Sequence, residues 1–78
     1  MSENVTINGV QCRGARAMLG WSRPRLAREA KVAERTVIDF ERGARNPQAS
    51  TLDAIQRALE AGGVRFTNGD EPGVKIVS

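Results

Sequence analysis

Charged side chains gather in the segment VAERTVIDFERG, residues 32–43, near the middle of the 78-residue chain. The segment holds Arg35 and Arg42 together with Glu34, Asp39 and Glu41. An arginine side chain is a planar fork that can donate paired hydrogen bonds to a phosphate. The same residue types also occur on the outer face of an ordinary core helix. The chemistry therefore raises two interpretations, a surface that binds nucleic acid and a solvated helix face.

The overall charge permits the first interpretation without requiring it. The formal net charge is +3, and ten of the twelve cationic residues are arginine. Residues 10–60 contain ten cations and six acids, so the excess lies in the middle of the chain. Basic proteins often bind nucleic acid, but many bind none.

The chain offers little that could support catalysis or metal binding. It has one cysteine, Cys12, and no histidine, which argues against an internal disulfide and against a zinc site. It also lacks a GxxxxGK phosphate loop. We expect no enzymatic activity, no catalytic residue, no metal and no cofactor.

Location in the cell is expected to be cytoplasmic. No run of about 20 apolar residues could span a membrane, and the start MSENVTINGV lacks the features of a signal peptide. We therefore expect a reducing, intracellular setting with no membrane partner.

The pattern of caps and apolar residues predicts four helices. Asn8, with Gln11 three residues later, predicts the start of a first helix that Gly20 ends. Ser22 predicts the cap of a second helix, RPRLAREA. A third helix is predicted over about 34–42, with Val37 and Phe40 buried, and a fourth over about 48–61.

The C-terminal segment changes period. VRFT and VKIV are β-branched or alternating, and NGDEPG between them predicts a hairpin. We expect one domain, 1–78, with a helical core at 8–61 and a hairpin extension at 62–78. The hairpin either joins two copies of the chain through Val64, Phe66, Val74 and Ile76, or folds over its own fourth helix.

The predicted second and third helices are short and are joined by a tight turn. This is the layout of a helix-turn-helix, here placed between a first and a fourth helix. Residues 10–61 resemble the helix-turn-helix family of phage-repressor and Cro type, often called the XRE family. The family pattern is matched by Ser22, Leu26, Ala27, Val32, Thr36, Val37, Glu41, Arg42, Gly43, Pro47, Leu52, Ile55 and Leu59. The resemblance implies a mainly α, λ-repressor-like fold.

The resemblance also implies a function and a set of contacts. Members place the third helix in the DNA major groove and let the second cross the phosphate backbone. It implies a transcriptional regulator, such as a repressor, that binds palindromic double-stranded DNA as a homodimer. Base-facing positions are those of Glu34, Arg35 and Asp39. Backbone-facing positions are those of Ser22, Arg23, Arg25, Thr36, Arg42 and Arg45.

The chemistry of the three base-facing residues suits particular bases. Arginine can bind guanine O6 and N7 together, and a carboxylate can accept from cytosine N4. We expect Arg35 to read a guanine and Glu34 or Asp39 to read a cytosine. The same acids, with an outward Ile38, leave open a protein-binding module, antitoxin-like or an anti-activator, that does not read DNA.

Two positions depart from the family pattern. Lys31 stands where the family commonly has glycine, and Ala33 replaces the usual Ser or Thr cap. Both substitutions are expected to cost stability. The resemblance further implies that Arg16 and Glu41 form a partly buried structural ion pair between the first and third helices.

Overall fold

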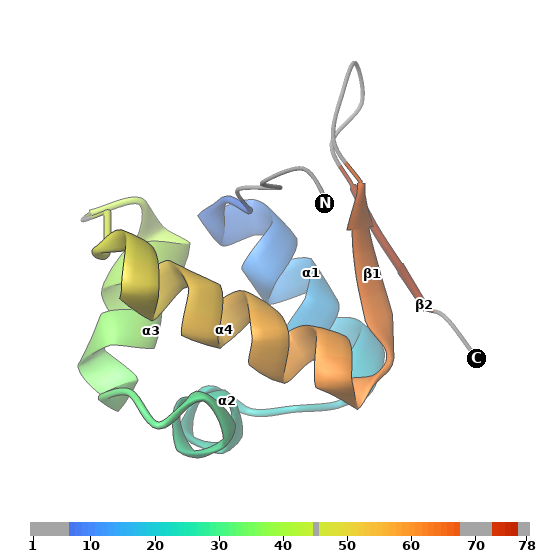
Figure 1. Cartoon of the computed structure of the whole chain (residues 1–78), viewed down its shortest axis with the longest axis horizontal. Helices are drawn as coiled ribbons and strands as arrows, with labels where there is room; N and C mark the ends of the chain where they lie inside the picture. The colour runs from blue at the N-terminus through green and yellow to red at the C-terminus, as the bar shows by residue number, and fades with distance from the viewer. Residues whose placement is uncertain (1–6, 45, 68–72, 77–78) are drawn as a thin grey trace.

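Four helices and a two-stranded hairpin follow one another in the described parts of the chain, residues 7–44, 46–67 and 73–76 of a computed structural model (Figure 1). The elements are α1 (Gly9–Leu19), α2 (Arg23–Ala30), α3 (Glu34–Arg42), α4 (Ala49–Gly62), β1 (Val64–Thr67) and β2 (Gly73–Ile76). The predicted mainly α, four-helix fold with a C-terminal hairpin is confirmed. The fourth helix begins and ends one residue later than predicted, which is the usual uncertainty of helix ends.

The predicted helix signals form the expected hydrogen bonds. The Asn8 side chain accepts from the Gln11 amide at 2.8 Å, and the Gln11 side chain accepts from the Asn8 amide at 2.9 Å. This capping box satisfies two of the amides that a helix start leaves unpaired. At α2, the Ser22 hydroxyl accepts from the Arg25 amide at 3.1 Å.

The turn between α2 and α3 carries the two substitutions that the family pattern singled out. Lys31 ends α2 in the left-handed conformation, with φ 61°, where glycine would be unstrained. A non-glycine residue costs roughly 1–2 kcal/mol there. Ala33 precedes α3 and makes no side-chain capping bond. Both costs predicted from the sequence therefore have a structural basis.

The core lies where the four helices meet. Cys12, Leu26, Val37, Ile55 and Leu59 are fully enclosed and come from all four helices. These residues form one continuous hydrophobic core, to which Val64 and Phe66 also belong.

Two glycines mark places where elements approach closely. A methyl group at Gly9 would overlap the Phe40 carbonyl, so the start of α1 packs directly on the end of α3. A methyl group at Gly62 would lie 2.8 Å from Trp21, which closes α4 against the α1–α2 connection. Trp21 therefore covers the edge of the core, as predicted.

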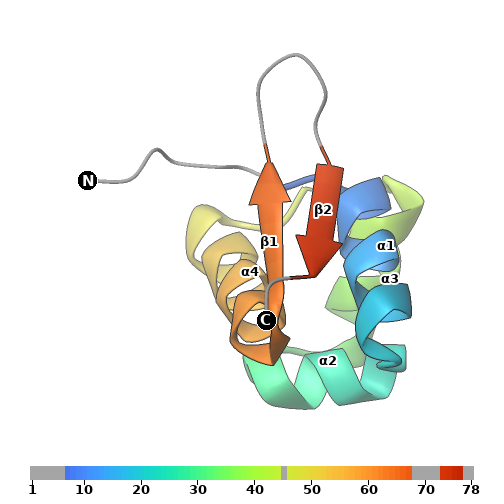
Figure 2. The same ribbon diagram turned by 90° about the vertical axis from the view of Figure 1, so that its right-hand side faces the viewer.

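The hairpin packs on the helices of its own chain (Figure 2). β1 pairs with β2 in antiparallel register, with Val64 opposite Ile76 and Phe66 opposite Val74. β1 lies beside α4 and β2 beside α1. β2 begins at Gly73, one residue earlier than predicted, and residues 68–72 of the predicted turn lie outside the described residues.

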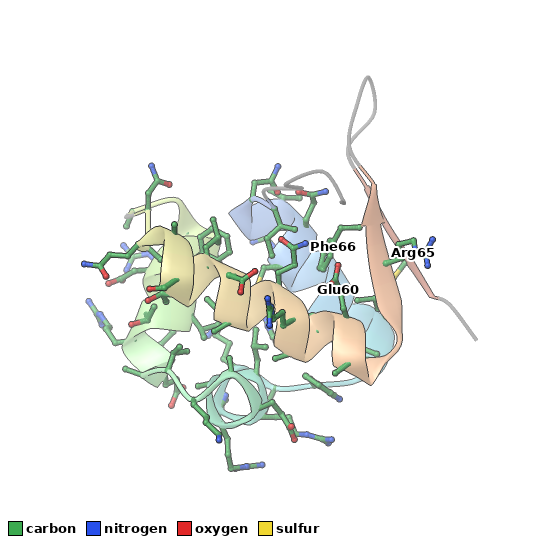
Figure 3. The ribbon with its side chains drawn as sticks, viewed as in Figure 1. Glu60, Arg65 and Phe66 are labelled. Carbon is green, nitrogen blue, oxygen red and sulfur yellow. The ribbon has the colours of Figure 1, made fainter. Side chains whose placement is uncertain are left out.

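Two residues predicted to join a dimer instead belong to the core. Val64 and Phe66 are buried against the helices, and Phe66 points toward them while Arg65 points away (Figure 3). A two-stranded hairpin is marginal in water unless one of its faces is covered. The burial of these two side chains favours the alternative that the hairpin folds over the helices of its own chain. The side chains of Val74 and Ile76 lie outside what the structure describes.

Among the residues described, no helix is both long enough and apolar enough to cross a membrane.

Candidate nucleic-acid interface

One buried carboxylate ties three helices together beneath the candidate interface. The Arg16 guanidinium on α1 donates from Nε to Glu41 Oε2 at 2.6 Å and from Nη2 to Glu41 Oε1 at 2.8 Å. The Glu41 side chain is only 3% exposed. Arg16 also donates from Nη1 to the Trp21 carbonyl at 3.0 Å, so all three nitrogens of its guanidinium have a hydrogen-bond acceptor. The structure thus brings together the two residues predicted to pair.

Two further side chains share the same carboxylate. The Cys12 thiol donates to Glu41 Oε2 at 3.3 Å, and Arg23, at the start of α2, donates from Nε to Oε1 at 3.5 Å. The sequence offers no local signal for either contact, because the partners are distant along the chain. Arg23 is therefore held where the end of α3 meets the start of α2.

The pKa values of the cluster follow from this geometry. Burial raises the pKa of the Glu41 carboxyl, but hydrogen bonds from Arg16, Cys12 and Arg23 and the charge of Arg16 outweigh burial and leave the pKa below its ordinary value. Burial raises the pKa of the Cys12 thiol, and the neighbouring Glu41 raises it further. The hydrogen bond to Glu41 raises the pKa of Arg16. The carboxylate is therefore charged and the thiol neutral.

The start of α2 presents its basic residues to solvent. Arg23 and Arg25 are exposed, and Ser22 is occupied as the cap. The Arg25 guanidinium lies 4.7 Å from the centre of the Trp21 ring and pairs with Glu29 at 3.2 Å. Stacking on a tryptophan face restrains a guanidinium without consuming all of its donors.

The outer face of α3 carries a second charged group. Arg35 Nε lies 3.4 Å from Asp39 Oδ1, and Arg42 Nη1 lies 3.9 Å from the same oxygen. The arginine side chains are 75% and 62% exposed, whereas Asp39 is 18% exposed. The i, i+4 and i, i+3 spacings are the signal from which the sequence could have predicted these pairs. Only the structure shows that the arginines are more exposed than Asp39.

The remaining predicted contacts have different surroundings. Glu34 is exposed and has no ion-pair partner within residues 7–44, 46–67 and 73–76. Thr36 is half-buried at the start of α3. Arg45 lies outside the described residues. Exposed Ile38 was expected, and the residue is half-buried instead.

Among the described side chains, no three cysteine, aspartate or glutamate residues stand close enough to hold a metal ion.

A comparison with protein families identifies the module. The helix-turn-helix family profile matches residues 13–62, which include all of α2, α3 and α4. The chain belongs to this family, the XRE or phage-repressor-like helix-turn-helix proteins, whose members are DNA-binding regulatory domains. No curated protein matches the chain in a sequence comparison.

Proposed function

We propose that this chain is a sequence-specific DNA-binding transcriptional regulator of the repressor type, with α3 in the major groove. The observation that carries the proposal is the outward position of Arg35 and Arg42 on α3, while Glu41 is withdrawn into the core and neutralised by Arg16. Acids on a reading helix repel phosphate, so removing one from the surface favours binding.

The proposed contacts divide by chemistry. Arg35 and Glu34 are exposed at the start of α3 and read base edges, a guanine and a cytosine respectively. Asp39 belongs to the same base-reading group through its pair with Arg35. Phosphate and sugar contacts come from Ser22, Arg23, Arg25, Thr36, Arg42 and Arg45. Arg23 suits this role because Glu41 holds its Nε and leaves its two Nη groups for the backbone.

The regulator acts in the cytoplasm. It acts there as a homodimer, because one module reads only a few base pairs. Two copies bind half-sites of a palindrome about one DNA turn apart. The helices and hairpin of each copy form one domain, since Val64 and Phe66 belong to the same cluster as the helices. Because Val64 and Phe66 are buried in that cluster, the surface that joins two copies excludes their side chains. Light scattering of the whole chain over a range of concentrations measures the oligomeric state.

Selection from a randomised duplex library tests the proposal. The protein is expected to enrich duplexes with two inverted half-sites one turn apart. Enrichment of a single half-site would contradict dimeric reading, and no enriched sequence at all would contradict sequence-specific binding.

A protein-binding module is the second candidate, and one observation favours it. On the exposed part of α3 the acids Glu34 and Asp39 balance Arg35 and Arg42, so the helix supplies little net attraction for phosphate. An antitoxin-like or anti-activator protein would tolerate this balance. It would co-purify with a protein partner and show no salt-sensitive binding to duplex DNA.

A further inference from the structure

Asp39 lies between two arginines on α3 and is less exposed than either of them. We infer that Asp39 is a positioning residue, which holds the Arg35 guanidinium for a guanine and does not itself read a base. This inference rests on the proposed DNA-binding function and deepens it. It makes guanine recognition at one base pair depend on two residues instead of one.

The ion-pair geometry leaves the necessary donors available. Asp39 Oδ1 faces Nε of Arg35 at 3.4 Å. A guanidinium carries five N–H donors, and binding guanine O6 and N7 requires two neighbouring ones. A carboxylate at Nε therefore leaves the two Nη groups at the tip of the side chain free to donate to guanine.

The order of exposure decides which residue a duplex meets. The Arg35 side chain is 75% exposed and Asp39 only 18%. Arg42, also outermost, approaches the same carboxylate oxygen at 3.9 Å. A cytosine amino group would have to pass two guanidinium groups to reach Asp39. Arg35 therefore contacts a base, while Asp39 contacts Arg35.

Helix stability does not account for an acid at position 39. Asp39 lies in the last turn of α3, where the helix dipole disfavours negative charge. The pair with Arg35 runs from arginine to acid along the chain, which is the weaker order for an i, i+4 pair. The pair with Arg42 has the better order but is long, at 3.9 Å. Exposed pairs of this kind contribute little to folding. A role in orienting the arginine explains the residue better.

The expected effect on binding has two parts with opposite signs. Orienting Arg35 before binding lowers the entropy lost when the guanine contact forms. The negative charge of Asp39 also weakens attraction to phosphate on every sequence. Asp39 therefore increases discrimination while it lowers non-specific affinity.

The test measures binding of whole-chain variants to the duplex recovered by library selection and to its single-base changes. Arg35→Ala identifies the guanine that Arg35 reads. Asp39→Asn is expected to lower the preference for that guanine about three- to tenfold and to tighten binding to an unrelated duplex. Asp39→Glu, which can still reach across one turn, is expected to retain the preference.

A matched control comes from α4. Asp53 pairs with Arg57 at 2.9 Å, also one turn apart, so Asp53→Asn removes the same charge from a similar pair. It is expected to leave the guanine preference unchanged.

Three results would overturn the inference. Asp39→Asn could leave the guanine preference intact, or it could relax a cytosine at another base pair, which would make Asp39 a base reader. A purely uniform change on all duplexes would make Asp39 an electrostatic residue only. If no duplex is recovered, the proposed function fails as well. If Arg35→Ala loses the guanine preference and Asp39→Asn keeps it, the proposed function is supported and the role of Asp39 is refuted.

Discussion

The Arg16 guanidinium and the Glu41 carboxylate join α1 to α3 through two charge-assisted hydrogen bonds, at 2.6 and 2.8 Å. The pair is nearly enclosed, and Cys12 and Arg23 satisfy further acceptor positions of the carboxylate. Glu41 is adjacent in sequence to Arg42, one of the exposed arginines. The end of the proposed reading helix is thus fixed by the core beneath it.

Removing the Glu41 carboxylate is expected to destabilise the fold strongly. Glu41→Ala leaves the Arg16 charge buried without its partner, and such changes cost about 3–5 kcal/mol. Denaturant unfolding followed by circular dichroism measures the loss. Asp53→Ala is the control, because Asp53 forms an exposed pair, and it should cost less than about 1 kcal/mol. Equal effects of the two substitutions would show that the Glu41 pair does not anchor the helices.

Acid is expected to weaken the fold through the same carboxylate. The pKa of Glu41 is lower in the folded chain than its ordinary value in the unfolded chain. Its contribution is therefore fully present above that value and is lost as the pH falls through the folded pKa. Unfolding free energies of the wild type and Glu41→Gln, measured from pH 7 downward, should converge in acid. Curves that stay parallel over the whole range would contradict this linkage.

The Cys12 thiol is expected to be unreactive in the folded protein. Burial and the adjacent Glu41 raise the pKa of the thiol, so very little nucleophilic thiolate forms near neutral pH. A chromogenic disulfide reagent should label Cys12 only as fast as the chain opens, and denaturant should accelerate labelling. Labelling of the native protein at the rate of a free cysteine would show that the thiol is accessible.

Glycine at position 31 is expected to stabilise the protein. Lys31 adopts φ 61° at the end of α2, so Lys31→Gly should relieve strain and gain about 0.5–1 kcal/mol after the entropy of the unfolded glycine is subtracted. Gly20→Ala offers the opposite control, because Gly20 has φ 71° and open space around it, and it should lose about 1 kcal/mol. A loss of stability in Lys31→Gly would mean that the lysine side chain contributes more than the backbone strain costs.

Local signals in the sequence predicted most of the fold. Asn8 with Gln11, Ser22, and the glycines at 20 and 43 each act within a few residues, so their consequences can be read from neighbouring positions. The pairing of Arg16 with Glu41 was anticipated from family resemblance, since nothing local relates residues 25 positions apart.

Other features depend on packing between distant segments. The contacts of Glu41 with Cys12 and Arg23 arise only after three helices meet. Alternation in VRFT predicted a strand correctly, but it could not show whether its apolar face meets a second copy or the chain's own helices. The burial of Val64 and Phe66 favours the chain's own helices.

The central claim is that α3 binds duplex DNA through Arg35. Its most direct test is the affinity of the wild type, Arg35→Ala and Arg57→Ala for the selected duplex as salt increases. Both arginines form one-turn pairs with aspartate and are similarly exposed, at 75% and 78%, so Arg57 is a matched control. The wild type and Arg57→Ala should bind tightly and lose affinity steeply with salt. Arg35→Ala should lose about 1–3 kcal/mol on the selected duplex and prefer it less over its single-base variants. Weak, salt-independent binding by the wild type, or equal losses in the two variants, would contradict the claim.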